Sequence, residues 1–296
     1  MARHGVSRPQ GPIERQPPPV HDQWDKALFT GSLSFTLATL PGRFLSPGTG
    51  RLGVADAGTE EIAAQQVARR AGTPVIPGSG IKGAVRTLYE LLTFSCDPFS
   101  KGCTTQECCA ACSLFGLAGW SGRVSFGDAE PAHAGAVRVE VRKVPTPWKP
   151  NPAKTGGDFR VYDQREATML DQGRNIWLPR LKELAREVLT GELRTRMTFW
   201  NATSDELGRL LLAMGLGPDD SVRFDLRLGG VKYDGQGGVR VTPEEIRLAT
   251  PRALTLRGID CKERCERWVR HAQQSAWSTT FWPVLEELAD ALQAAD

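Results

Sequence analysis

Apolar and polar residues alternate along residues 27–40, which read ALFTGSLSFTLATL. Leu33, Phe35 and Leu37 share one face of an extended chain, and the small polar residues between them share the other. Because successive side chains of a strand point to opposite faces, this segment predicts a strand with one buried face. Comparable strand patterns occur at residues 123–126, 136–144, 193–200, 222–228 and 239–241.

A different spacing, with apolar residues three or four positions apart, follows the turn-forming residues PGSG at 77–80. Ile81, Val85, Leu88 and Leu92 have this spacing, which predicts a helix, and Ser79 lies where an N-cap is expected. Residues 204–214 predict a second helix, because an acidic first turn opens the segment and glycines follow it.

The remaining segments complete the expected fold. Residues 177–189 and 261–295 predict helices, the second in two pieces broken near Pro283. Residues 41–58 predict a loop, and residues 60–70 predict a short helix or a mobile insertion. The order strand, helix, strand, strand, helix, strand predicts an α+β fold with a modified ferredoxin-like or RRM-like core. We expect an arm at 1–24 that is disordered or bound to a partner, a domain at 25–258 and a C-terminal helical segment at 259–296.

Composition and charge narrow the class of protein only slightly. The 296 residues carry a net charge of +3, which permits a nucleic-acid partner without requiring one. No apolar run approaches the roughly 20 residues of a membrane span, and the start of the chain has no apolar stretch typical of a secretory signal. These features predict a cytoplasmic protein without a membrane partner.

Five of the seven cysteines fall between Cys96 and Cys112, in the pattern C-x6-C-x4-C-C-x2-C. Thiols stay reduced in the cytoplasm, so this density predicts a metal site rather than disulfides. A structural zinc ion takes four such ligands, and either Cys108 or Cys109 must be spare. The spacing to Cys112 favours Cys109, so the expected zinc ligands are Cys96, Cys103, Cys109 and Cys112.

Two glycine-rich basic loops are candidates for binding RNA. The first, PGSGIKGAVR at 77–86, places glycines and a helix N-terminus beside two cations, a combination that suits phosphate. The second, GGVKYDGQGG at 229–238, has five glycines and a tyrosine able to stack on a base. A strand-turn-helix and a long hairpin loop are the alternatives. The expected RNA contacts are Gly78, Ser79, Gly80, Lys82, Arg86, Gly229, Gly230, Lys232, Tyr233, Gly235 and Gly237.

An ordered series of motifs resembles the RAMP superfamily, the RNA-binding backbone subunits of type III CRISPR effector complexes. IPGSGIKGAVR resembles its IPGSSLKGxxR motif, and CSLFG followed by GRVSFGDA resembles LFG...GRVxxxDA. FWNATSDELGRLLLAMGL resembles a helix-bearing segment of those subunits, and LGGVKYDGQGGVRV resembles their glycine-rich loop. The series spans about residues 33–241, and its order makes the resemblance specific.

The resemblance implies copies or paralogues stacked along a guide crRNA that pairs with a complementary target RNA. It implies a thumb-like insertion at 145–175, in which Trp148 and Lys149 would touch nucleic acid. The stretch LGVADAGTE resembles the loop after the first strand of target-cleaving members, and Asp56 lies at the position of their catalytic aspartate. Cleavage there would use Mg or Mn, although residues 60–73 add length that the family pattern lacks.

The sequence therefore predicts a guide-RNA-binding subunit of a CRISPR ribonucleoprotein, with cleavage at Asp56 as an open extension. The alternative is a non-catalytic scaffold that holds other subunits of the complex through the zinc knot and C-terminal helices. The four histidines are scattered, and no Ser/His/Asp or Cys/His pattern favours an independent hydrolase.

Overall fold

The structure is a computed structural model that describes residues 5–19, 23–56, 61–96, 102–144, 159–160, 184–219, 222–232, 235–249 and 256–293. Its helices are α1 (Gly78–Leu91), α2 (Ala110–Phe115), α3 (Ser204–Ala213), α4 (Cys261–Gln274) and α5 (Ala276–Leu292). Its longer strands are β2 (Phe29–Thr39), β3 (Gly48–Asp56), β4 (Glu61–Val67), β11 (Val137–Val144), β13 (Leu184–Ala202) and β15 (Gly238–Ala249). The short strands are β1 (Gly5–Val6), β5 (Arg69–Arg70), β6 (Thr73–Pro74), β7 (Gly116–Leu117), β8 (Trp120–Ser121), β9 (Val124–Phe126), β10 (Glu130–Pro131), β12 (Phe159–Arg160), β14 (Leu226–Arg227) and β16 (Leu256–Ile259).

Strand β2 lies at the centre of the main sheet, between β15 and β13, and pairs antiparallel with both. Strand β9 pairs antiparallel with the other edge of β13, so the four strands lie in the order β15-β2-β13-β9. The register places Leu37 beside Leu193 and Val241. The structure is therefore an α+β fold, and the alternation at residues 27–40 forms the strand that it predicted.

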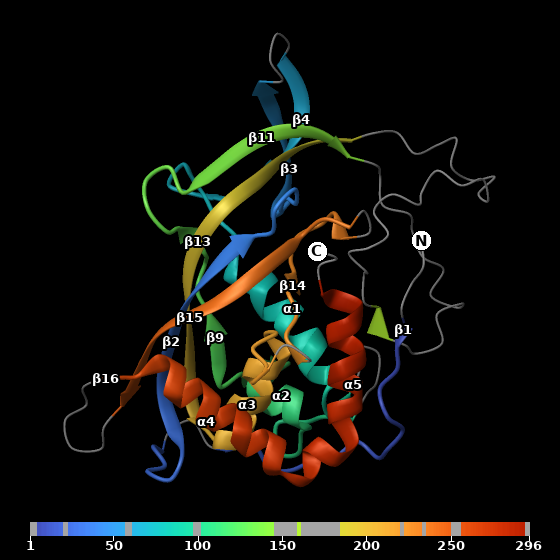
Figure 1. The fold of residues 1–296 in the computed structure, drawn as a ribbon, viewed down its shortest axis with the longest axis vertical. Helices are drawn as coiled ribbons and strands as arrows, with labels where there is room; N and C mark the ends of the chain where they lie inside the picture. Colours follow the sequence, from blue (N-terminus) through green and yellow to red (C-terminus); the bar gives the residue numbers. More distant parts are fainter. Residues whose placement is uncertain are drawn as a thin grey trace.

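The two faces of β2 have different surroundings. Leu33, Phe35 and Leu37 are fully buried on the face that the helices cover, and the Phe35 ring meets the Phe126 ring edge-on at 6.4 Å. Figure 1 shows the helices grouped on one side of β2, β13 and β15. The opposite face carries hydroxyl side chains that long neighbouring side chains cover; Arg196 Nε, for example, donates to Ser34 Oγ at 3.3 Å. This second face of the sheet is the outer face.

The 19-residue strand β13 extends beyond the four-stranded core. Its first half pairs with β11 over residues 184–191 and touches β4 through Arg186 and Gln65. Strands β3 and β4 form a hairpin that stands away from the helices (Figure 1). The predictions of a loop at 41–58 and of a short helix at 60–70 are therefore wrong where the chain forms β3 and β4. The expected helix at 177–189 is wrong from residue 184, because pairing with β11 and with Leu45 stabilises an extended chain there; residues 177–183 lie outside the described part.

Smaller differences concern element ends. The C-terminal helices separate at Ser275, whose backbone is extended and whose hydroxyl donates to Ala272 O at 2.8 Å. Pro283 lies inside α5 instead of breaking it, because Phe281, Val284 and Leu285 hold that helix against the core. The expected strand at 222–228 is reduced to β14. The helix at 78–91 begins after Pro77, so Ser79 is not its N-cap.

Both terminal segments contact the central core. Val6 is fully buried, and the backbones of Gln16 and Cys108 exchange two hydrogen bonds of 3.0 Å. In α4, the Trp268 ring meets Phe29 at 5.4 Å and Phe199 at 5.9 Å, both edge-on. Within the described residues, none of the helices has the length and apolar composition needed to cross a membrane.

Candidate metal centre and nucleic-acid surface

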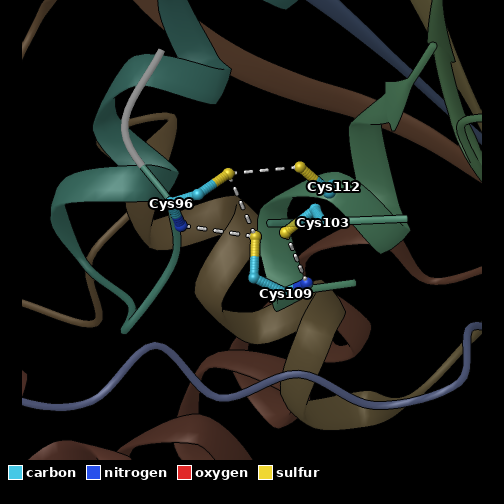
Figure 2. A group of neighbouring side chains, drawn as sticks. All are labelled: Cys96, Cys103, Cys109 and Cys112. Carbon is cyan, nitrogen blue, oxygen red and sulfur yellow. Dashed lines mark hydrogen bonds between the residues drawn. The ribbon is translucent and has the colours of Figure 1, made fainter. Parts of the chain in front are cut away.

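Four cysteines converge between the end of α1 and the start of α2 (Figure 2). Cys96 follows α1, Cys103 lies in the connecting segment, Cys109 is the N-cap of α2, and Cys112 lies within α2. Their sulfur atoms all lie within 4.8 Å of one another. Cys96 Sγ is 3.4 Å from Cys112 Sγ and 3.6 Å from Cys109 Sγ.

These distances suit a tetrahedral metal site. Zinc bonds to thiolate sulfur at about 2.3 Å, so the sulfurs of a tetrahedral Zn-S4 site lie roughly 3.8 Å apart. The cluster could therefore hold a metal ion such as zinc with little movement. All four donors are cysteines and three of them are buried, which is typical of a structural rather than a catalytic zinc site. Cys108 is not part of this group; its backbone pairs with Gln16, and its buried thiol bonds to Ser113.

The crowded thiols alter one another's ionisation. Hydrogen bonding with Cys109 raises the pKa of Cys96 to about 12. Hydrogen bonds from Cys112 and Cys96 hold the pKa of Cys109 well below its usual range, whereas the pKa of Cys112 is raised. Four like charges at this spacing repel one another, and a divalent cation that binds all four would remove that repulsion.

Arg86 joins α1 to the cysteine cluster. Its Nε donates to Glu90 at 2.7 Å, its Nη1 to Gly116 O at 2.9 Å, and its Nη2 to Cys112 Sγ at 3.6 Å. Burial opposes the charged form, but the Glu90 carboxylate outweighs it and the pKa of Arg86 is raised. Since the guanidinium binds Cys112 and Glu90, Arg86 is well placed to orient a metal ligand, and its contact with RNA stays a prediction.

Lys82 lies one turn before Arg86 and is half-buried. Burial, followed by the nearby charge of Arg86, lowers its pKa. Lys82 forms no ion pair within the described part of the chain. Around it the first turns of α1 are open: Ser79, Gly80 and Gly83 are exposed, and added methyl groups at the two glycines would meet nothing within 4 Å. We call the exposed residues Ser79, Gly80 and Gly83, together with Lys82, the α1 surface.

Gly78, the first residue of α1, has an internal role. Its N–H donates to Asp128 Oδ1 at 2.8 Å, which stabilises the helix N-terminus with a negative charge. A Cβ at this position would lie 2.1 Å from the Phe126 carbonyl oxygen. The packing of α1 against the end of β9 therefore accounts for glycine at position 78, and its contact with RNA stays a prediction.

The second glycine-rich loop packs against the chain at residues 44–46. Gly230 N donates to Ser46 O at 3.1 Å, and Gly237 N donates to Phe44 O at 2.9 Å. Gly229, Gly235 and Gly237 have positive φ angles of 89°, 70° and 91°, which side chains with a Cβ rarely adopt. The backbone that approaches this loop thus belongs to the protein itself, and Tyr233 lies outside the described residues.

Lys232, in the same loop, is partly buried. Burial lowers its pKa, and the nearby positive charge of Arg227 lowers it further. Its carbonyl oxygen accepts a hydrogen bond from Arg227 Nη2 at 3.2 Å. Two cations therefore lie close together where this loop leaves β14.

Besides Tyr233, three expected site residues have no described side chain. Asp56 ends β3, where its backbone pairs with Glu61 at the tip of the hairpin, so it lies in a strand rather than in the loop where it was expected. Trp148 and Lys149, with nearly all of the expected thumb-like insertion at 145–175, lie outside the described residues, as do residues 57–60.

Three residues that link the motifs were missed from the sequence. Asp128 joins GRVSFGDA to the start of α1, and Arg123 of the same motif binds Glu206 of α3. The capping box between Thr203 and Glu206 was visible as T-x-x-E, a pattern that marks helix starts. Arg123 and Asp128 could have been found because both are charged residues of the GRVSFGDA motif and lie beside apolar positions that are expected to be buried.

Comparison with family models identifies a match of residues 65–193 to the RAMP superfamily. The match confirms the resemblance over the segment that holds α1, the cysteine cluster and the GRVSFGDA motif, and it ends before α3 and the second glycine-rich loop. A search of curated proteins found no match.

Proposed function

We propose that this chain, which matches the RAMP superfamily over residues 65–193, is a crRNA-binding backbone subunit of a CRISPR effector in antiviral defence. RAMP proteins generally work in CRISPR complexes with RNA and other subunits. Within the matched segment, the observation that carries the proposal is Lys82. This half-buried cation lies beside a second cation, and its own charge has no carboxylate partner among the described residues.

A phosphate group would supply the charge that Lys82 lacks. A partly buried ammonium is costly without a counter-charge, and its lowered pKa is a measure of that cost. Arg86 already has Glu90, so Lys82 is the cation of this pair that is left for an external anion. The exposed, glycine-containing first turns of α1 let a sugar-phosphate backbone approach closely.

The strand order supports the same family-level assignment. The elements β2, α1, β9, β13, α3 and β15 follow one another along the chain, and their strands lie in the order β15-β2-β13-β9. This order is typical of a ferredoxin-like core, which RRM domains share. We infer that copies or paralogues of the chain line up along the guide, each holding a short stretch of RNA.

Zinc in the four-cysteine cluster would serve this function indirectly. The metal would fix Cys112, and Cys112 accepts a hydrogen bond from Arg86 on the helix that presents Lys82. The cluster thereby links α2 to the helix with the α1 surface. Its chemistry supports a structural role, and no step of RNA binding requires an open coordination position.

The test is RNA binding by the purified chain, with a labelled single-stranded RNA and a titration of salt. Lys82→Gln is expected to weaken binding roughly tenfold and to reduce the slope of log K against log salt by about 0.7, the loss of one phosphate contact. Lys262→Gln, which removes an exposed lysine on α4, is the matched control and should bind as the parent does. Equal binding by all three proteins would refute the role of Lys82.

Two further outcomes separate the neighbouring hypotheses. A parent protein that binds no RNA but retains its partner subunits would favour the non-catalytic scaffold.

Cleavage at Asp56 is a separate prediction supported by the family resemblance, and the assembled complex with complementary RNA and Mg or Mn tests it. Asp56→Ala should abolish cutting while guide binding persists; undiminished cutting would exclude Asp56 as the catalyst.

A further inference from the structure

The outer face of the main sheet contains a cavity of about 370 Å³, to which the motifs GRVSFGDA and FWNATSDELGRLLLAMGL contribute lining residues without indicating a ligand. Its floor spans three strands: Thr198 on β13 lies opposite Ser32 on β2 and opposite Ser125 on β9. Arg196 and Trp200 bound this row on either side along β13. Adjacent strands lie about 4.8 Å apart and residues rise about 3.3 Å along a strand, so the floor measures roughly 10 by 13 Å.

Four hydrogen-bonding side chains of this cavity have no partner within the described part of the chain. No hydrogen bond joins the hydroxyls of Ser32, Ser125 or Thr198 to another described residue, and Trp200 Nε1 has no acceptor there. The exposed hydroxyls of Ser125 and Thr198, held opposite each other on rigid strands, are well placed to bind a polar ligand.

The charge of the cavity is positive. Arg196 is exposed and bonds to Ser34, and it forms no ion pair within the described residues. Its neighbour on the same face, Arg194, is paired with Glu244 at 2.6 Å, and Arg247 is paired with Glu245 at 2.8 Å. Arg123 also lines the cavity, but Glu206 neutralises it. None of the described lining residues carries a carboxylate, and Arg196 is the lining cation without an ion pair, although its charge also acts on the Glu245 carboxylate of β15.

We propose that this cavity, bounded by Arg196, Trp200, Ser32, Thr198 and Ser125, binds one nucleotide of single-stranded RNA, a contact separate from the α1 surface. The inference rests on the proposed function and adds a second RNA subsite to it. Arg196 binds a phosphate, the hydroxyls bind the ribose or a base edge, and a base stacks on Trp200. The volume lies near the lower end of the range for small ligands, roughly 300–1,000 Å³, which suits one nucleotide rather than a folded partner.

Arg196→Gln is the main test, because the side chain is exposed and its removal leaves no buried charge. Anisotropy of a fluorescein-labelled single-stranded RNA should show roughly tenfold weaker binding, with a salt slope reduced by about 0.7. Arg194→Gln is the matched control, since Arg194 lies two residues away on the same face, has its own carboxylate and does not line the cavity. It should bind as the parent does.

Trp200 supplies a second variant with a different readout. Loss of a stacked base in Trp200→Leu should weaken binding roughly 5- to 100-fold, while Trp200→Phe keeps an aromatic face and most of the affinity. Circular dichroism checks that these variants fold. If Trp200→Leu does not fold, Arg196→Gln alone tests the nucleotide site.

The outcomes distinguish this cavity from the proposed function as a whole. If Lys82→Gln weakens binding while Arg196→Gln matches the parent, the nucleotide site is refuted and the proposed function stands. If Arg194→Gln and Arg196→Gln weaken binding equally, the effect is general charge and the site is likewise refuted. A parent protein that binds no RNA refutes both.

Discussion

Arg123 and Glu206 form a buried ion pair that joins two of the family-like motifs. Arg123 Nη1 lies 3.1 Å from Glu206 Oε2, Nη2 contacts Oε1, and the arginine side chain has no exposed surface. Glu206 also accepts the Thr203 N–H at 2.9 Å and so completes the capping box of α3. The segment before β9 is thereby fixed to the start of α3, 83 residues further along the chain.

Breaking this pair should cost more stability than breaking a surface pair. Arg123→Met leaves the Glu206 carboxylate buried without its cation, and we expect the free energy of unfolding to fall by about 3–5 kcal/mol. Arg267→Met removes an exposed pair with Glu263 on α4, and a loss below about 1 kcal/mol is expected. Urea unfolding of the three proteins measures both values, and similar losses for the two variants would contradict the assigned role.

The same carboxylate predicts sensitivity to acid. Burial alone would raise the pKa of Glu206. The hydrogen bonds that Arg123 donates, together with its positive charge, outweigh burial, so the pKa of Glu206 is lowered. A glutamate in the unfolded chain has a pKa of about 4.3, so the ion pair makes its full contribution to the free energy of unfolding above that pH. That contribution is lost as the pH falls through the lower pKa of the folded state.

Urea unfolding at several pH values below about 5 tests this prediction. The free energy of unfolding of Glu206→Gln should depend less steeply on pH than that of the parent. Glu263→Gln, at an exposed position on α4, should keep the parent's slope. A Glu206→Gln protein with an unchanged slope would show that another group dominates the acid response.

Two glycines of α1 should respond in opposite directions to alanine. Gly78→Ala would place a Cβ 2.1 Å from the Phe126 carbonyl oxygen, and we expect a loss of roughly 1–3 kcal/mol as α1 and β9 separate. Gly83→Ala meets nothing within 4 Å and should stabilise the exposed helix by about 0.5–1 kcal/mol. Thermal unfolding followed by circular dichroism measures both, and a harmless Gly78→Ala would refute the packing explanation.

Metal analysis of the purified chain tests the cysteine cluster. We expect about one zinc per chain, lost in Cys112→Ser and retained in Cys108→Ser, because Cys108 lies outside the cluster. Chelation should lower the unfolding temperature of the parent and of Cys108→Ser. It should leave Cys112→Ser unchanged. Zinc affinity should fall as the pH falls, since the thiols must lose protons to bind the metal. Zinc-free parent protein at full stability would refute the site.

The sequence alone was sufficient for features that depend on neighbouring residues. Alternation around Phe35 predicted β2, the spacing of Ile81 and Val85 predicted α1, and the acidic turn at Ser204 predicted α3. The cysteine spacing selected the four residues that the structure brings together. Each of these signals lies within a few turns of helix or a few residues of strand, where local geometry determines which side chains meet.

Only the tertiary structure decided what the motif residues contact. Residues 184–189 had a helical pattern, yet they are extended because β11 and Leu45 supply their hydrogen bonds from distant parts of the chain. Gly78 and Arg86 were expected at RNA, but Asp128 and Cys112 engage them. The cavity at Arg196 forms from three strands that are far apart in sequence. Pairing between distant strands sets such contacts, and no local pattern encodes the partner that each residue will meet.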